Sequence, residues 1–201
     1  MEAETGPENS DQDTTEPRTE ANGITPGIER WCLPKDQIYS CMTRMQNNSS
    51  LVVDKRFEVR RLEISDYGKG FIDLLQQLTV CDSITEEQFR ERFEELNAYG
   101  DDHVICVIED GQSGKIIATG SVFVEKKFLR NCGKVGHIED VVVDSNARGM
   151  QLGKKIVGFL TDHARSRGCY KVILDCSVEN RPFYEKCGFK QKEVQMIKYF
   201  I

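Results

Sequence analysis

The sequence has little that could build a metal site. None of its eight cysteines stands in a Cys-x-x-Cys pair, and its three histidines, His103, His137 and His163, are far apart. Structural zinc sites draw on closely spaced pairs of these residues. We therefore predict no metal, and free thiols in a reducing compartment such as the cytoplasm.

Two further absences limit the partners. No apolar run approaches the ~20 residues that a membrane-spanning helix needs, and the chain does not begin with the basic and apolar pattern of a signal sequence. Residues 1–30 hold eight acidic residues and two arginines, the whole formal net charge of -6, so residues 31–201 balance at zero. A neutral body lacks the basic footprint that nucleic acid requires. We expect neither a nucleic-acid partner nor an integral membrane segment.

Composition divides the chain into a tail and one domain. Residues 1–30 are rich in Glu, Asp, Thr, Pro and Asn, and they bury too little apolar surface to offset the entropy of ordering. Residues 31–53 include apolar side chains that leave docking on the domain open, but the polar stretch 46–50 favours a linker. We predict a disordered acidic tail and linker over residues 1–54 and one domain over residues 55–201.

Hydrophobic periodicity and turn residues predict the elements of the domain, in the order β, α, α, β, β, β, α, β, α, β. Thr85 and Gln88 fit a capping box at the start of the second helix, and residues 110–114 fit a hairpin loop. Strands are expected at residues 57–62, 103–109, 115–123, 136–143, 171–176 and 189–200, and helices at residues 65–79, 85–100, 152–163 and 180–186.

The junction between the fourth strand and the third helix predicts an anion site. Residues 144–154 read Asp-Ser-Asn-Ala-Arg-Gly-Met-Gln-Leu-Gly-Lys. The unpaired N–H groups of a helix's first turn, with the helix dipole, bind phosphate, and Arg148 and Lys154 supply nearby cations. A plain strand, turn and helix with a glycine hinge is the alternative.

The element order and this junction resemble the GNAT superfamily of acyl-CoA-dependent N-acetyltransferases. Its phosphate-loop pattern is Gln/Arg-x-x-Gly-x-Gly/Ala, which Arg148 and Gly153 match, whereas Gln151 stands where the family usually has glycine. A Cβ fits there if the position is right-handed helix. The resemblance implies acetyl-CoA as co-substrate and a GNAT domain of the α/β (α+β) class: a central mixed, mostly antiparallel, twisted sheet flanked by helices on both faces.

A closer resemblance, over residues 57–200, is to the glucosamine 6-phosphate N-acetyltransferase family. It implies acetyl transfer to the amine of D-glucosamine 6-phosphate, on the route to UDP-N-acetylglucosamine, by a homodimer with shared active sites. Peripheral association with endomembranes stays open. The stretches that carry the resemblance are residues 78–79 with 84–85, 125–128, 136–143, and 168–176 with Asn180 and 183–189.

This resemblance also implies roles for single residues in a direct transfer. Tyr184 would give a proton to the departing thiolate, while Glu139 and Asp175 would orient the amine and help to deprotonate it, with the choice of base left open. Coenzyme contacts are implied at Val141, Val142, Val143, Arg148, Gly149, Met150, Gln151, Leu152, Gly153, Lys154, Asn180 and Tyr184. Sugar-phosphate contacts are implied at Thr79, Glu125, Lys126, Lys127, Phe128, Glu139, Asp140, Val141, Asp175, Cys176 and Lys198.

The chemistry of amine attack on a thioester fits these roles. The developing oxyanion needs a donor, and a bulge or splay in the fourth strand would leave the backbone N–H of Val141 free to polarise the carbonyl. Cys176 and Cys187 are not expected as nucleophiles, because no histidine is placed in sequence to activate either.

Simpler interpretations remain beside these roles. Tyr184 can be a core aromatic, Asn180 a helix cap, and the acids and lysines solvated surface groups. An acetyltransferase for a polyamine or a protein amine, and a catalytically silent acyl-CoA-binding domain, are the alternative functions.

Overall fold

The computed structural model describes residues 57–200, so the predicted tail and linker lie outside the described residues. The strands of this part are β1 (Val59–Arg61), β2 (His103–Glu109), β3 (Ile116–Lys126), β4 (Lys134–Val143) and β5 (Cys169–Ile173). They form one sheet in the order β1-β2-β3-β4-β5, antiparallel except for the parallel pair of β4 and β5. The prediction of a mixed, mostly antiparallel sheet is confirmed.

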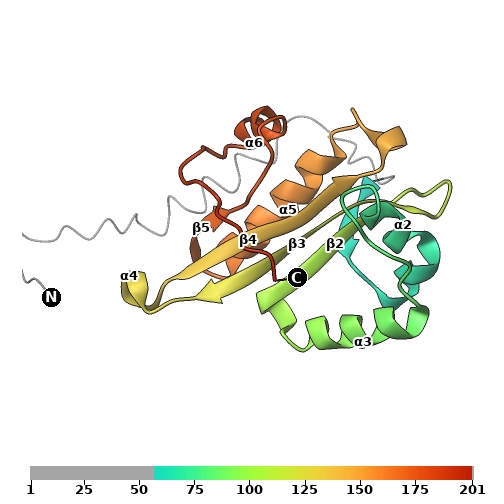
Figure 1. Ribbon diagram of the computed structural model, residues 1–201, viewed down its shortest axis with the longest axis horizontal. Coiled ribbons are helices and arrows are strands. Elements are labelled where there is room, and N and C mark those ends of the chain that lie inside the picture. Colours follow the sequence, from blue (N-terminus) through green and yellow to red (C-terminus); the bar gives the residue numbers. More distant parts are fainter. Residues whose placement is uncertain (1–56, 201) are drawn as a thin grey trace, which may run out of the picture. The chain divides into compact units, whose positions relative to one another are not determined.

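Helices cover both faces of this sheet, which is also as predicted. Figure 1 shows α2 and α3 on one face and α5 on the other, and the two buried clusters lie on these two faces. The helices are η2 (Ile64–Lys69), α2 (Phe71–Leu75), α3 (Glu86–Asn97), η3 (Gly100–Asp102), α4 (Leu129–Cys132), η4 (Ser145–Ala147), α5 (Leu152–Ser166) and α6 (Arg181–Lys186).

The helix α5 packs most closely on the sheet. Its buried stripe includes Leu152, Ile156 and Leu160, none more than 1% exposed. Burying a side chain of this kind contributes about 1.5 to 3 kcal/mol. Gly120 on β3 permits this approach, because a Cβ there would lie 2.8 Å from Ile156 Cγ2. These contacts fix the distance between the first turn of α5 and the strands β3 and β4.

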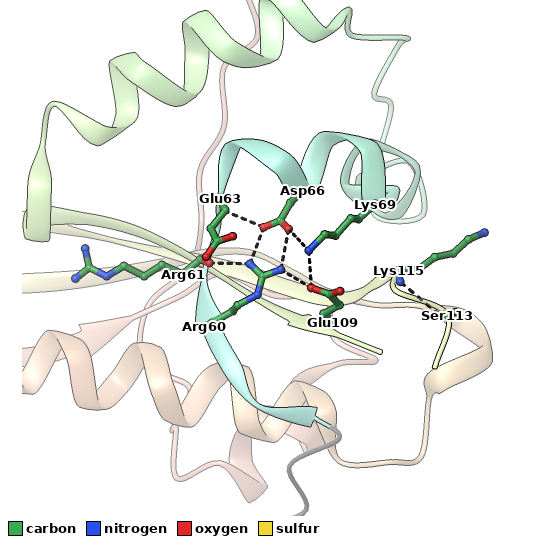
Figure 2. A network of polar contacts seen from close by, with 8 residues as sticks. All are labelled: Arg60, Arg61, Glu63, Asp66, Lys69, Glu109, Ser113 and Lys115. Atoms are coloured by element: carbon green, nitrogen blue, oxygen red, sulfur yellow. Dashed lines mark hydrogen bonds and ion pairs between the residues drawn. The ribbon is translucent and has the colours of Figure 1, made fainter. Parts of the chain in front are cut away.

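A polar network anchors the opposite side of the domain (Figure 2). Asp66, which is fully buried, accepts two bonds of 2.7 Å from the guanidinium of Arg60. Glu109, at the end of β2, accepts bonds of 2.7 Å from both Arg60 and Lys69. Asp66 also accepts the backbone N–H of Glu63 at 2.8 Å. The network joins β1, η2 and β2, and so it fixes the chain where α2 begins.

Two of the predicted elements are wrong. The single helix expected at residues 65–79 is instead η2 followed by α2, because Gly70 between them has a φ of 79° and ends the first helical segment. The strand expected at residues 189–200 is not formed in the described chain. Its apolar side chains are exposed, with Val194 at 81% and Met196 at 88%. A strand needs a ladder partner, and this segment has none within the described chain.

The other predicted elements are confirmed within a few residues. The capping box of α3 is present, since Gln88 N–H donates to Thr85 Oγ1 at 3.2 Å and Thr85 N–H donates to Gln88 Oε1 at 2.9 Å. The predicted strand at residues 103–109 is β2 without any shift.

Candidate active site

A bulge in β4 shapes the middle of the candidate site. Thr119 pairs with Val142 and Ser121 pairs with Glu139, so two residues of β4 stand opposite Gly120. Asp140, within the bulge, has a φ of 54°. Because of the extra residue, the side chains after the bulge no longer continue the alternation between the two faces of the sheet. Val141 packs in the cluster under α5. The sequence predicted a bulge or splay here, and both occur.

The splay follows directly after the paired part of β4. The parallel pairing of β4 with β5 ends at His137 and Ile173. Beyond these residues, no residue of β4 pairs with β5 in the described chain. The backbone of residues 138–143 therefore has one edge that an extended ligand can pair with in place of a strand. The side chains of Val141 and Val143 pack in the cluster under α5, and the side chain of Val142 packs in the cluster under α2 and α3. The backbone edge of these residues stays open.

The loop from β4 to α5 follows this open edge. Asp144 Oδ1 accepts the N–H of Asn146 at 2.8 Å and caps η4. Gly149 then turns with a φ of 85°, and Gln151 is the N-cap of α5 with φ 60° and ψ 17°. The condition under which a Cβ fits at Gln151 without strain, a right-handed helical position, is therefore not met. The position is left-handed, which explains why glycine is the usual residue there.

The start of α5 leaves its first N–H groups available. Gln151 makes no side-chain capping bond, so it does not satisfy the N–H groups of the first turn. Leu152 and Gly153 are buried under this turn, whereas Arg148 and Lys154 are exposed on either side of it. The first turn of α5 thus offers the backbone donors that an anion site needs, and the exposed Arg148 and Lys154 lie before and within this turn in the sequence.

The short helix α6 brings Tyr184 to the same end of the domain. A Cβ built on Gly153 would lie 3.1 Å from Phe183 Cζ, so only the small glycine lets α6 approach α5 this closely. The half-buried ring of Tyr184 packs edge-on against Phe183 and Phe189, with centroids 4.9 and 6.1 Å away. Burial, followed by Cys176, Cys187 and Glu139, raises the pKa of Tyr184, so the phenol keeps its proton.

The predicted acidic residues gather beside Tyr184. Partial burial, then the neighbouring charges of Asp140 and Asp175, raises the pKa of Glu139 above its ordinary value. Asp175 Oδ2 accepts a bond of 2.9 Å from Gln195 Nε2. Asp175, Cys176 and Tyr184 also line a hollow of about 490 Å³. The structure therefore brings the acids, the phenol and the open edge of β4 together.

Other predicted site residues lie apart from this group. Lys126 pairs with Asp102 at 2.5 Å, and Lys127 pairs with Glu125 at 2.6 Å. Lys126 lies opposite Lys134, at the end of β4 remote from residues 144–151, which we call the coenzyme loop for the role that the family resemblance implies. In the turn after β3, Phe128 is 96% exposed. Thr79 is exposed after α2, and Lys198 lies 5.7 Å from the ring of Phe200.

His137 and Cys187 lie in environments that suit structural residues. His137 Nε2 lies 2.9 Å from Glu125 Oε2, and its ring stacks on Phe123 with centroids 4.4 Å apart. Burial raises the pKa of Cys187, which disfavours a thiolate nucleophile. Among residues 57–200, no cluster of three or more His, Cys, Asp or Glu could hold a metal ion, and no helix could span a membrane.

One functional contact escaped the sequence. The side-chain amide of Gln77 bonds to Asp144 and to the N–H of Ser145, at the start of the coenzyme loop. Nothing local marks Gln77, because its partners lie 67 and 68 residues away.

Sequence and fold comparisons agree with this geometry. Residues 71–189 match the model of the acetyltransferase (GNAT) family. The glucosamine 6-phosphate N-acetyltransferase of Arabidopsis thaliana is 72% identical over 144 residues, 72% of this chain and 97% of that protein. The glucosamine 6-phosphate N-acetyltransferase 1 of Dictyostelium discoideum is 51% identical over 75% of this chain and 95% of its own. The crystal structure of the Arabidopsis enzyme aligns with a TM-score of 0.71 and 71% identity over 72% of this chain and 99% of that one.

Proposed function

The chain belongs to the acetyltransferase (GNAT) family, and from that premise we propose that it is a glucosamine 6-phosphate N-acetyltransferase. It transfers the acetyl group of acetyl-CoA to the amine of D-glucosamine 6-phosphate, giving N-acetyl-D-glucosamine 6-phosphate and coenzyme A. The observation that carries this proposal is the 72% identity to an enzyme of that name over 97% of its length. The product is a precursor on the route to UDP-N-acetylglucosamine, and the free cysteines of the described chain support a cytoplasmic location.

Acetyl-CoA would lie along the end of the domain where β4 and β5 splay. The open edge of residues 141–143 would pair with the amide groups of the pantetheine arm. The first turn of α5 would bind the pyrophosphate, with Arg148 and Lys154 beside it. Asn180, in the turn before α6, would contact the coenzyme from the other side. The coenzyme supplies the thioester that the amine attacks.

Three groups of this chain would then divide the chemistry. The N–H of Val141 stabilises the negative charge that develops on the thioester oxygen. Glu139, whose pKa is raised, is suited to take a proton from the ammonium group, directly or through water. Tyr184, held protonated by burial, returns a proton to the departing thiolate of coenzyme A. Asp175 stands next to Glu139 and orients the amine.

The phosphate of the sugar needs cations, and the family resemblance implies Lys126 and Lys127 for this role. Glu139 lies five positions along β4 from Lys134, the partner of Lys126. This is roughly 16 Å at ~3.3 Å per strand residue, longer than an amino sugar phosphate. The backbone of Lys126 is thus remote from Glu139, and both lysines form ion pairs in their own chain, Lys126 with Asp102 and Lys127 with Glu125. We infer that they serve the active site of a second copy, as a homodimer with shared sites would allow.

The last segment supports the same assembly. Residues 189–200 carry the exposed side chains of Val194, Met196, Ile197, Tyr199 and Phe200, 66% to 90% accessible. β5 is also an edge strand of the sheet. In a homodimer the segment could complete the ladder that it lacks in the isolated chain.

The proposal is tested by supplying acetyl-CoA with a panel of amines and measuring the release of coenzyme A. Glucosamine 6-phosphate should be acetylated, whereas a polyamine and a lysine peptide should not. Turnover with the polyamine or the peptide alone would assign the alternative acceptor. Binding of coenzyme A that raises the melting temperature, with no turnover of any amine, would identify a silent acyl-CoA-binding domain.

A further inference from the structure

The side chain of Gln77 joins two distant segments through both ends of its amide. Gln77 Nε2 donates to Asp144 Oδ2 at 2.8 Å, and Gln77 Oε1 accepts the backbone N–H of Ser145 at 3.0 Å. The orientation of the amide is fixed by its partners, because a carboxylate accepts only and a backbone N–H donates only. One side chain therefore clamps two consecutive residues at the point where β4 ends.

The clamped residues determine how the coenzyme loop leaves the sheet. Asp144 N–H donates to Ile117 O at 2.8 Å, and its carbonyl accepts Ala147 N–H at 2.9 Å. The sheet thus holds the turn from one side and Gln77 holds it from the other. Downstream, Gly149 and Gln151 both adopt positive φ. For the glutamine, unlike the glycine, such a conformation persists only where the surrounding structure fixes it.

The backbone that carries Gln77 is itself held in place. The side chains of Phe71, Ile72 and Leu74 in α2 are buried, and Gln77 N–H donates to Leu74 O at 3.1 Å. The network of Arg60, Asp66 and Glu109 fixes the chain before α2 (Figure 2). Because its backbone is fixed, the Gln77 side chain can hold residues 144–145 in a fixed position relative to α2.

We propose that Gln77 is a positioning residue for acetyl-CoA: its amide holds residues 144–145 so that the first turn of α5 faces the pyrophosphate. The inference rests on the proposed function, since it concerns the coenzyme site of that enzyme. The loss of Gln77 should raise the dissociation constant of coenzyme A and the KM for acetyl-CoA while kcat changes little.

A pair of isosteric substitutions tests the clamp. Gln77→Glu turns the donor into a charged acceptor facing Asp144, and we expect about a 5-fold to 10-fold weaker affinity for coenzyme A. Asp144→Asn added to it reverses the direction of the bond. The amide introduced at position 144 can then donate to the carboxylate introduced at position 77, keep its oxygen for the N–H of Asn146, and leave the net charge as in the wild type. The affinity of the double variant for coenzyme A should recover to within about 2-fold of the wild-type affinity.

The control is Gln76→Glu, which adds the same charge at an exposed neighbour whose side chain makes no contact with residues 144–145 in the described chain. Calorimetry with coenzyme A and steady-state kinetics are the measurements. The clamp is refuted if Gln77→Glu behaves like Gln76→Glu, or if the double variant is no better than the weaker single one. A wild type that does not bind coenzyme A would instead refute the proposed function.

Discussion

Gln151 shows how a single residue can hold an unfavourable conformation in a binding loop. A side chain at φ 60° costs roughly 1 to 2 kcal/mol relative to right-handed backbone. The sequence identified the loop but not this conformation, because glutamine is also common inside helices. The packing of the next residue compensates for the conformational cost at Gln151, since Leu152 is buried and only 1% exposed. The sequence motif thus marked this loop as a candidate, and only tertiary structure determined its backbone.

Tyr184 gives the sharpest prediction at this scale. Tyr184→Phe removes the hydroxyl but keeps the ring that packs on Phe183 and Phe189. If the phenol gives its proton to the thiolate, kcat should fall about 100-fold, while the dissociation constant of coenzyme A should change less than about 2-fold. Tyr170→Phe, on the exposed part of β5, is the matched control and should leave both unchanged. An unaltered kcat in Tyr184→Phe would remove the acid role.

At the scale of elements, the sequence predicted best where the pattern is local. The capping box of α3 and the strand β2 required only neighbouring residues, and both are confirmed. The helix expected at residues 65–79 failed because Gly70 ends its first part and the buried Asp66 belongs to a network that reaches Glu109, 49 residues beyond Arg60. Contacts over such distances leave no periodic pattern. The partners of Gln77 were missed for the same reason.

The network that anchors α2 predicts acid sensitivity. Burial raises the pKa of Asp66, but the bonds from Arg60 and the Glu63 N–H, together with the charges of Arg60 and Lys69, outweigh it, and the pKa ends below its ordinary value. The stabilisation is therefore complete above the pKa of Asp66 in the unfolded chain. It is lost as the pH falls through the lower folded value.

Replacing the carboxylate makes this measurable. Asp66→Asn should lower the free energy of unfolding at neutral pH by about 2 to 3 kcal/mol. This value is at the low end of what breaking a buried ion pair costs, because the Arg60 side chain is 28% exposed. The difference from the wild type should shrink as the pH falls below about 4. Urea unfolding at several pH values measures it, with the exposed Asp73→Asn as control. A difference that stays constant with pH would contradict the role of the ionised carboxylate.

At the scale of the whole molecule, the hollow that Asp175 and Tyr184 line also includes the cations Lys171, Arg181, Lys190 and Lys192, whereas the lysines that the resemblance implies lie elsewhere. The sequence resemblance named Lys126 and Lys127, and the register of β3 and β4 puts them at the far end of the sheet. One chain's sequence cannot say which copy a residue serves. A shared site in a homodimer reconciles the two observations.

Mixed dimers test that arrangement. In Lys126→Ala/Lys127→Ala the KM for glucosamine 6-phosphate should rise at least about 100-fold, because each of the two charge-assisted bonds to the phosphate is worth roughly 1.5 to 3 kcal/mol. The KM for unphosphorylated glucosamine should not change. Co-expression of this variant with Tyr184→Phe should restore one intact site per mixed dimer. Activity no higher than the sum of the two parents would place the lysines and Tyr184 of one chain in the same site.

The central claim is that this chain acetylates an amino sugar that carries a phosphate. Its most direct test is the kcat/KM of the purified chain for glucosamine 6-phosphate compared with glucosamine, at fixed acetyl-CoA. We predict a preference of at least about 100-fold for the phosphorylated sugar, as expected for two charge-assisted bonds. Equal rates for the two sugars, or no release of coenzyme A with either, would contradict it.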